Sequence, residues 1–313
     1  MAEIIQKDGA WAFDGDALRL TPGRDRNISV LRRTLGELSV PLRALAGISF
    51  EQGKRAGRLR LRLRDGADPL LHATGGRLAE PHDPYQLLVE PDRFGVAEYL
   101  ADEVRNALLL EQVPTGPVTE YLLPGPAVPL SVSAGDGTAS FDGERIRLEW
   151  NWKTEDAKAA AGPRVLAPAD LTGVEWLPAA GLENGHLRLA VRGAPDAAPP
   201  KYDPNAVELW GFKKDPLMAL VAAAVQARLP HPAGAAAPAP GPGAGAGAGP
   251  GAAAADGPAG RRTERAAPHG APPAEDEHDA LLRRLRELGE LHRSGVLTGE
   301  EFALAKQAVL KRM

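Results

Sequence analysis

The chain of 313 residues contains no cysteine. This absence excludes disulfide bonds, thiol catalysis, iron–sulfur clusters and cysteine-ligated zinc. A strong excess of one charge is also missing. The formal net charge is −4, which weighs against attraction of the whole protein to nucleic acid or to an anionic membrane. Finally, the longest apolar run, Leu217–Val225, has nine residues, whereas a membrane-spanning helix needs about 20.

Motifs of known catalytic sites are missing as well. The sequence has no Gly-x-Ser-x-Gly nucleophile elbow and no Gly-x-Gly-x-x-Gly between a strand and a helix. Its seven histidines form no i, i+4 pair, and prolines flank His82-Asp83, which indicates a plain loop there. We therefore expect no enzymatic activity, no metal site and no cofactor. The first ten residues lack the pattern of a signal peptide, so we expect a cytoplasmic protein.

A change of composition near Pro230 marks the end of the folded part. From Pro232 to Gly260 every residue is Ala, Gly or Pro except Asp256. Such a stretch has no large apolar side chain to offset the entropy lost on ordering, and residues 261–279 add charge and more proline. We predict a disordered linker over 230–279, with a mean reach of about 40 Å.

The part before this linker repeats itself, at an offset of 128 residues that shrinks to about 120. The matching segments are Asp8-Gly9 with Asp136-Gly137, Phe13-Asp14-Gly15 with Phe141-Asp142-Gly143, Gly57–Leu61 with Gly185–Leu189, and Asp83-Pro84 with Asp203-Pro204. A period this long indicates a duplicated domain, because solenoid repeats run about 20–50 residues. We predict two copies of one fold, over residues 1–112 and 130–229.

Each copy begins with a strand-like pattern. Trp11 and Phe13 alternate with small residues, Asp14-Gly15 supplies a turn, and the alternation then resumes, which predicts a β-hairpin. Residues 58–64 read R-L-R-L-R-L-R, the period of two that is typical of a strand with one buried face. Residues 186–191 repeat this pattern in the second copy.

Each copy ends with a helical pattern. In the first copy, apolar residues recur at helical spacing between Val96 and Leu108. In the second, we expect Asp215 to be the N-cap and Pro216 the first helical residue of a helix that runs over 217–229. Several antiparallel strands closed by one helix predict a small barrel or sandwich with a capping helix.

These features resemble a known family. The Phe-Asp-Gly start, the passage from Val40-Pro41-Leu42 to Gly47-Ile48, the Gly-x-Leu-x-Leu strand and the final helix resemble bacterial pleckstrin-homology-like (PH-like) domains. In tandem, over about 210 residues, they resemble the actinobacterial domain-of-unknown-function family 4429. The resemblance implies a mostly β fold with α: two tandem PH-like antiparallel β-barrel or sandwich domains, each closed by a C-terminal helix. It implies no established activity.

The last 34 residues predict a pair of helices over 280–313. Ser294-Gly295 ends the first helix, and Thr298 with Glu301 forms a capping box for the second. The segment resembles the SHOCT domain, a short helical pair that is thought to act in oligomerisation or partner binding. A solvated hairpin is the simpler alternative, but so short a segment does not bury a stable core alone. The expected interface residues are Leu281, Leu285, Leu288, Leu291, Phe302 and Val309.

One charge pattern suggests a binding surface. Between residues 19 and 64, twelve basic residues face three acids. Because side chains alternate along a strand, one sheet face carries Arg58, Arg60, Arg62 and Arg64. This row would bind a phospholipid headgroup, nucleic acid or an acidic peptide. Alternatively, it is the solvated side of a half-buried strand, paired with downstream acids, and the second copy has His186, Arg188, Ala190 and Arg192 instead.

The sequence as a whole predicts a non-enzymatic binding or scaffold protein. Two PH-like modules would be tethered to a C-terminal hairpin that binds another copy of the chain or another protein, so that several weak sites on one homo-oligomer act together. The first alternative is a peripheral membrane sensor that binds anionic lipid through the arginine row. The second is a nucleic-acid-binding protein, against which the near-neutral net charge weighs.

Overall fold

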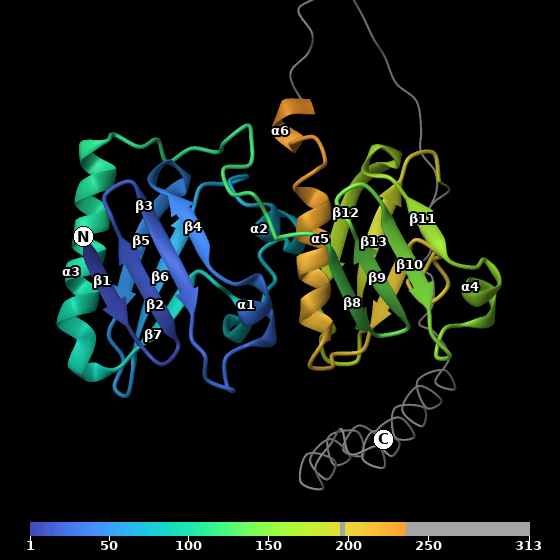
Figure 1. Cartoon of the computed structure of the whole chain (residues 1–313), viewed down its shortest axis with the longest axis horizontal. Coiled ribbons are helices and arrows are strands. Elements are labelled where there is room, and N and C mark those ends of the chain that lie inside the picture. The colour runs from blue at the N-terminus through green and yellow to red at the C-terminus, as the bar shows by residue number, and fades with distance from the viewer. Residues whose placement is uncertain (195–197, 236–313) are drawn as a thin grey trace, which may run out of the picture. The chain divides into compact units, whose positions relative to one another are not determined.

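The computed structural model describes residues 1–194 and 198–235. These described residues belong to one compact unit, which consists of two halves of like layout, each with a helix after its strands (Figure 1). The predicted linker lies almost wholly outside the described residues. The predicted hairpin lies entirely outside them, and so do its six interface residues from Leu281 to Val309.

The first half contains two antiparallel sheets and three helices. Strands β1 (Ala2–Ile5), β2 (Gly9–Phe13), β3 (Ala17–Pro22) and β4 (Leu38–Pro41) form one sheet in sequence order. The other sheet consists of β5 (Leu45–Glu51), β6 (Gly57–Leu63) and β7 (Gln86–Val89). Helix α1 (Val30–Leu35) precedes β4, α2 (Pro69–Thr74) precedes β7, and α3 (Phe94–Leu110) closes the half. Single 3-10 turns are η1 (Leu42–Ala44), η2 (Glu80–His82) and η3 (Pro91–Arg93).

The second half has the same strand order. Strands β8 (Leu130–Ala134), β9 (Gly137–Phe141), β10 (Ile146–Trp150) and β11 (Arg164–Leu166) form its first sheet, and β12 (Leu171–Leu177), β13 (Gly185–Val191) and β14 (Ala206–Leu209) form its second. Its helices are α4 (Asp156–Ala160), α5 (Met218–Gln226) and α6 (Pro232–Ala235), with 3-10 turns η4 (Pro168–Asp170) and η5 (Asp215–Leu217). The predicted strand-rich copies, each closed by a helix, are thus confirmed.

The repeated Phe-Asp-Gly motif forms the same turn in both halves. Oδ1 of Asp14 accepts hydrogen bonds from the backbone N–H groups of Asp16 and Ala17, at 3.0 and 2.9 Å. Oδ1 of Asp142 accepts the equivalent bonds at 2.8 and 2.7 Å. In both cases these backbone hydrogen bonds lower the pKa of the carboxyl group. The glycine that follows has a φ of 113° in the first half and 109° in the second, a conformation that favours glycine.

The repeated Asp-Gly motif near the start of each half ties the two sheets together. Oδ1 of Asp8 accepts a hydrogen bond from Arg32 at 2.8 Å, and its Oδ2 accepts one at 3.0 Å from the backbone N–H of Leu88 in β7. In the second half, Asp136 pairs with Lys158 at 2.6 Å and accepts from the backbone N–H of Glu208. Each acid therefore links the first hairpin, a short helix and the last strand.

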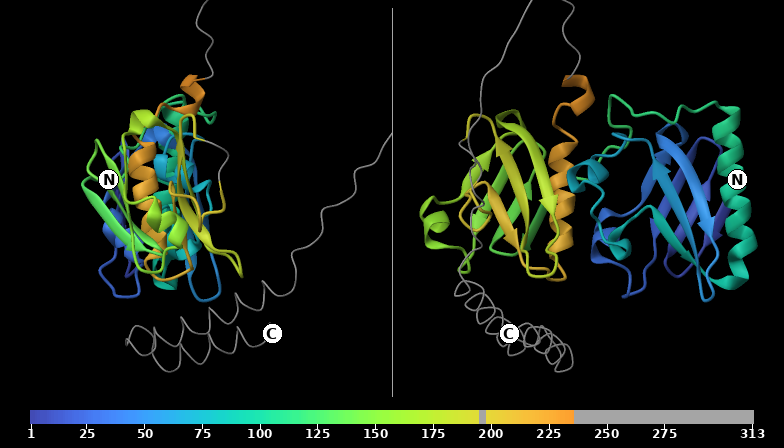
Figure 2. Two further views of the ribbon diagram at one scale, coloured as in Figure 1. Left: turned by 90° about the vertical axis from the view of Figure 1, so that its right-hand side faces the viewer. Right: turned by 180° about the vertical axis from the view of Figure 1, so that it is seen from behind.

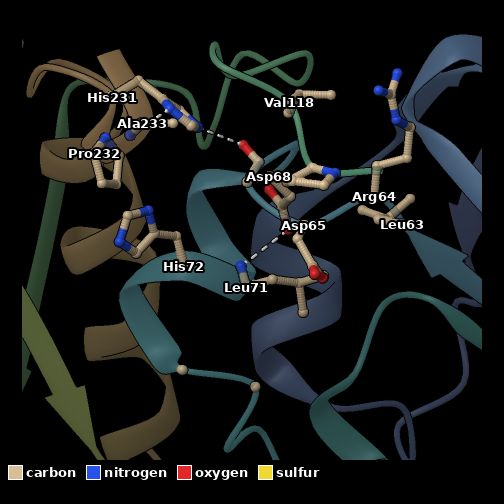
Figure 3. A pocket seen from close by; sticks show the side chains of 14 residues that line it. Leu63, Arg64, Asp65, Asp68, Leu71, His72, Val118, His231, Pro232 and Ala233 are labelled. Carbon is tan, nitrogen blue, oxygen red and sulfur yellow. Dashed lines mark hydrogen bonds between the residues drawn. The ribbon is translucent and has the colours of Figure 1, made fainter. Parts of the chain in front are cut away.

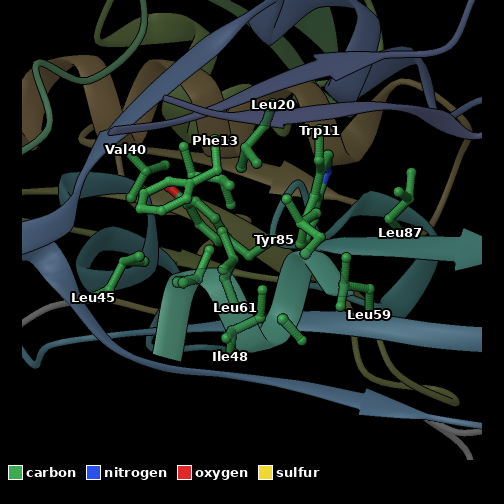
Figure 4. Packing of buried hydrophobic residues seen from close by; sticks show 14 of the residues in the cluster. Trp11, Phe13, Leu20, Val40, Leu45, Ile48, Leu59, Leu61, Tyr85 and Leu87 are labelled. Atoms are coloured by element: carbon green, nitrogen blue, oxygen red, sulfur yellow. The ribbon is translucent and has the colours of Figure 1, made fainter. Parts of the chain in front are cut away.

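The core of the first half is built by the alternation along its strands. Trp11 and Phe13 on β2 and Leu59 and Leu61 on β6 point inward, between the two sheets (Figure 4). Helix α3 closes this core with Leu100 and three other buried residues. The segment between the halves also takes part, because its Val118 and Leu123 are buried in the same cluster.

The start of the last helix differs from the prediction. Asp215 is not the N-cap of α5: it lies in the turn η5, and α5 begins at Met218 and ends at Gln226. Oδ2 of Asp215 instead accepts from the backbone N–H groups of Gly211 and Phe212, at 2.7 and 3.0 Å. The carboxylate therefore stabilises the loop before α5, because it hydrogen-bonds to these two loop N–H groups and not to the first turn of the helix. Burial raises the pKa of this carboxyl.

Helix α5 is covered on all sides. Every one of its nine residues is buried. One face lies on the strands of the second half, and α2 of the first half packs against another face (Figures 1 and 2). Leu31 on α1 and Leu70 and Ala73 on α2 belong to the buried cluster of the second half. The first half thus supplies part of the second half's core.

Candidate functional site

The row of arginines predicted as an anion-binding face lies on β6 and just after it. Strand β6 spans Gly57–Leu63, so the row extends one residue beyond it. A single acid, Glu80, forms ion pairs with two of these arginines. Oε1 of Glu80 accepts from Nη1 of Arg58 at 2.8 Å and from Nη2 of Arg60 at 2.6 Å. These two guanidinium groups are therefore partly neutralised before any ligand arrives.

The other two arginines differ from each other. Arg64 donates from Nε to the carbonyl oxygen of Gly116 at 2.8 Å and from Nη1 to that of Arg43 at 3.0 Å. It thereby ties the segment between the halves to the first half. Arg62 is exposed and makes one long hydrogen bond, 3.4 Å, to the carbonyl oxygen of Ala46. Arg62 alone in this row is available to a ligand without loss of a short contact.

A hydrogen-bonded network crosses the boundary between the halves. The Oη atom of Tyr121, in the segment between the halves, accepts from Nε2 of Gln226 on α5 at 2.7 Å. The same hydroxyl lies 2.7 Å from Nδ1 of His72 on α2. Since the hydroxyl accepts from Gln226, it is placed to donate to an unprotonated Nδ1 of His72. Burial, and then the charge of His231, lower the pKa of His72, which favours this neutral form.

His231, which follows α5, completes the network. Its ring packs edge-on against Tyr121 with 4.8 Å between ring centroids, and its Nε2 lies 3.1 Å from the carbonyl oxygen of Gly66. A cavity of about 550 Å³ lies beside it, with His72 and His231 on one side and Leu63 and Arg64 on the other (Figure 3). Residues from both halves and from the segment between them thus surround one cavity.

Asp68 lines the same cavity but has a structural role. It is the N-cap of α2, and its two carboxylate oxygens accept from the backbone N–H groups of Leu70 and Leu71, both at 3.0 Å. The Oη of Tyr85 donates a third hydrogen bond at 2.7 Å. Burial raises the pKa of Asp68. The acid holds α2 in the orientation that covers α5.

The described residues contain neither a metal centre nor a membrane helix. Within residues 1–194 and 198–235, no group of three or more His, Cys, Asp or Glu side chains could hold a metal ion. Of the helices in these ranges, none combines the length and the apolar character that crossing a bilayer demands. The chemistry available around the cavity of Figure 3 includes hydrogen bonding by the ring nitrogens of His72 and His231.

Sequence reasoning missed this boundary, because its residues are far apart in the chain. His72, Tyr121 and Gln226 belong to three separate segments, and no spacing connects them. One signal was present. The nine-residue apolar run at Leu217–Val225 has no polar face, and a helix that is apolar all round is buried all round. That run implies a second cover for α5 beyond its own sheets.

Comparison with known proteins agrees with the duplication. The family model described as "Domain of unknown function (DUF4429)" matches the chain twice, over residues 11–105 and 139–226. The two matches fall on the two halves, from β2 to α3 and from β9 to α5. None of the curated proteins matches the chain. With more than half of its residues matched by this model, the chain belongs to the DUF4429 family.

Proposed function

We propose that the chain is a non-enzymatic binding and scaffold protein. Its two halves would be PH-like domains that form one binding module, and its C-terminal segment would be a SHOCT-like hairpin that joins copies of the chain or binds another protein. The layout of each half supports the PH-like assignment: a four-stranded and a three-stranded antiparallel sheet, followed by a helix. The double match to one family model supports the tandem arrangement.

The burial of α5 is the observation that carries this proposal. Because α2 of the first half packs on α5 and Leu31 of α1 belongs to the same buried cluster, the halves are held together by a shared apolar core. Two domains joined by a linker alone would move independently. Binding surfaces on a joined pair keep a constant spacing instead, and this suits a protein that holds partners in a defined relation. Weak contacts made at such a spacing add up to stronger binding.

Solution mass tests the role assigned to residues 280–313. Light scattering would compare the full chain with a variant that ends at Ala235. The cut is placed after His231, because this residue contacts Tyr121 and Gly66. We expect an oligomer for the full chain and a monomer for the shortened one. If both are monomers, the proposed self-association is wrong, and residues 280–313 would instead be used to search for another protein that binds them.

The membrane alternative now depends mainly on Arg62, since Glu80 and backbone carbonyls occupy the rest of the row. Sedimentation with vesicles of anionic lipid tests it. The membrane role would be favoured over the scaffold role if the protein sediments with the vesicles, if salt abolishes this co-sedimentation and if Arg62→Ala reduces it. Replacing all four arginines would be a poorer test, because Arg64 also holds the segment between the halves.

A further inference from the structure

A second cavity between the halves, of about 490 Å³, has walls from four segments. The first half contributes residues 26–30, before and at the start of α1, and the turn that ends at His82. The second half contributes the end of β12 with Trp176 and the loop that runs from Gly211 to Pro216. The cavity exists only because the halves are packed together, and neither half alone would form it.

The charge around this cavity favours an anion. Arg26 stands on the wall from the first half and Lys213 on the wall from the second. Both are exposed, and neither forms an ion pair or a side-chain hydrogen bond within the described ranges. Asp215 is the one acid of the lining. Its Oδ2 is bound to the backbone N–H groups of Gly211 and Phe212, and its buried Oδ1 has no hydrogen-bond partner among the described residues, so the two cations outnumber this one acid.

Polar groups on the walls add hydrogen-bonding capacity. Oγ of Ser29 and Nδ1 of His82 lie 2.7 Å apart, and both residues line the cavity. Trp176 also lines it, is 2% exposed, and has a buried Nε1 with no hydrogen-bond partner among the described residues. A buried N–H without a partner is costly.

Apart from Asn27, the remaining lining is apolar and partly flat. It consists of the rings of Trp176 and Phe212, the prolines 81, 178 and 216, and small aliphatic side chains. A few polar groups set in an apolar wall are typical of small-molecule sites. The volume is within the usual range of about 300–1,000 Å³.

We propose that this cavity binds a small organic anion with a flat apolar body. Its anionic group would lie between Arg26 and Lys213, and its body against Phe212 and the prolines of the lining. This goes beyond the proposed scaffold role, and the oligomeric state does not bear on it. A carboxylate and a phosphate monoester share the required chemistry, and the experiment separates them.

Calorimetric titration of the full chain tests the proposal with four probes. Benzoate and phenyl phosphate carry the anion and the ring, benzamide carries the ring alone, and inorganic phosphate carries the charge alone. We expect one of the two aromatic anions to bind at least about tenfold more tightly than benzamide or inorganic phosphate, since hydrogen bonds to charged groups are the strong ones. The tighter aromatic anion identifies the carboxylate or the phosphate class.

Charge reversal at the cavity supplies the matched variants. Arg26→Glu and Lys213→Glu should each weaken the aromatic anion about tenfold or more. Arg24→Glu and Lys214→Glu change the same net charge at neighbouring residues outside the lining and should leave binding within about twofold. Thermal unfolding of all four variants shows whether each is folded.

Three results would overturn the proposal. Equal weakening by the cavity and control variants would mean that only general surface charge acts. Equal binding of benzamide and benzoate would mean that the charges take no part. No heat of binding for either aromatic anion at millimolar concentration, with the folded chain, would mean that the cavity is not a site of this class.

Discussion

Helices α3 and α5 close the two halves of a duplicated fold, yet their surroundings are opposite. Each helix has buried leucines, such as Leu100 of α3 and Leu220 of α5. The outward faces differ. On α3, Glu98, Tyr99, Asp102, Arg105 and Asn106 are exposed, whereas all nine residues of α5 are buried.

This difference shows how a duplicated domain becomes one part of a larger unit. Helix α3 keeps the polar outer face of a surface helix. Helix α5 has lost it, and small side chains allow α2 of the first half to approach closely. The second half has no counterpart of α2 between β13 and β14 among the described residues. Within the described residues, the first half therefore covers the last helix of the second half, and the second half has no equivalent helix to cover α3.

The largest expected effect comes from exchanging the two outward faces at one position. Ala222→Asp gives α5 an acid of the kind that α3 exposes, at a residue that is 0% exposed. A buried charge without a partner should cost about 3–5 kcal/mol of unfolding free energy. The reverse exchange is the control. The side chain of Asp102 is 64% exposed, so Asp102→Ala should cost about 0.5 kcal/mol or less. Urea denaturation measures both, and equal losses would contradict the comparison.

A smaller effect is expected from removing one hydroxyl at the boundary. Tyr121→Phe leaves the amide of Gln226, which is 4% exposed, without its hydrogen bond to Oη. Such a buried unpaired group should cost about 1–3 kcal/mol. Tyr99 on α3 is 56% exposed, so Tyr99→Phe should change stability by less than about 0.5 kcal/mol. Thermal unfolding measures the stability of both variants. If Tyr121→Phe is as stable as the native chain, the network at Tyr121 does not stabilise the boundary.

Acid should weaken the boundary between the halves. Burial lowers the pKa of His72, His82 and His186, so in the folded state each favours its neutral form. Their stabilising effect is present above the ordinary pKa near 6.5 and is lost as the pH falls through it. Burial raises the pKa of Asp68 and Asp136, which acts in the opposite direction at lower pH.

The variant His72→Gln isolates the contribution of His72, at the boundary between the halves, to this pH dependence. Between pH 7.5 and 5.5 the unfolding free energy of the native chain should fall, and His72→Gln should fall less steeply because one proton uptake is removed. Urea denaturation at several pH values measures the slopes. Identical slopes for the two proteins would show that His72 does not take part in the pH dependence.

The smallest effect is expected on β6. Arg62 corresponds to Ala190 of the second half, and its one hydrogen bond is 3.4 Å long. Arg62→Ala should therefore change the unfolding free energy by about 0.5 kcal/mol or less. A loss of several times that amount in thermal unfolding would mean that Arg62 has a structural role like that of Arg64.

Local patterns predicted the elements well, because they depend on neighbours in the sequence. The hairpin at Asp14-Gly15, the strand at residues 58–64 and the helix from Val96 to Leu108 all follow from alternation, turn residues and helical spacing. The role of Asp215 did not follow, because two loop N–H groups compete with the helix for its carboxylate. The boundary did not follow either, since it joins segments that only the packing of the two halves brings together.

Cooperative unfolding tests the central claim, that the halves share one core, most directly. Calorimetry of the variant that ends at Ala235 should show a single transition, with equal calorimetric and van't Hoff enthalpies. The same scan on this shortened chain with Ala222→Asp should show two transitions, one for each half. Two well-resolved transitions in the shortened chain without this substitution would contradict the account, since they would show that α5 does not need the cover that α2 provides.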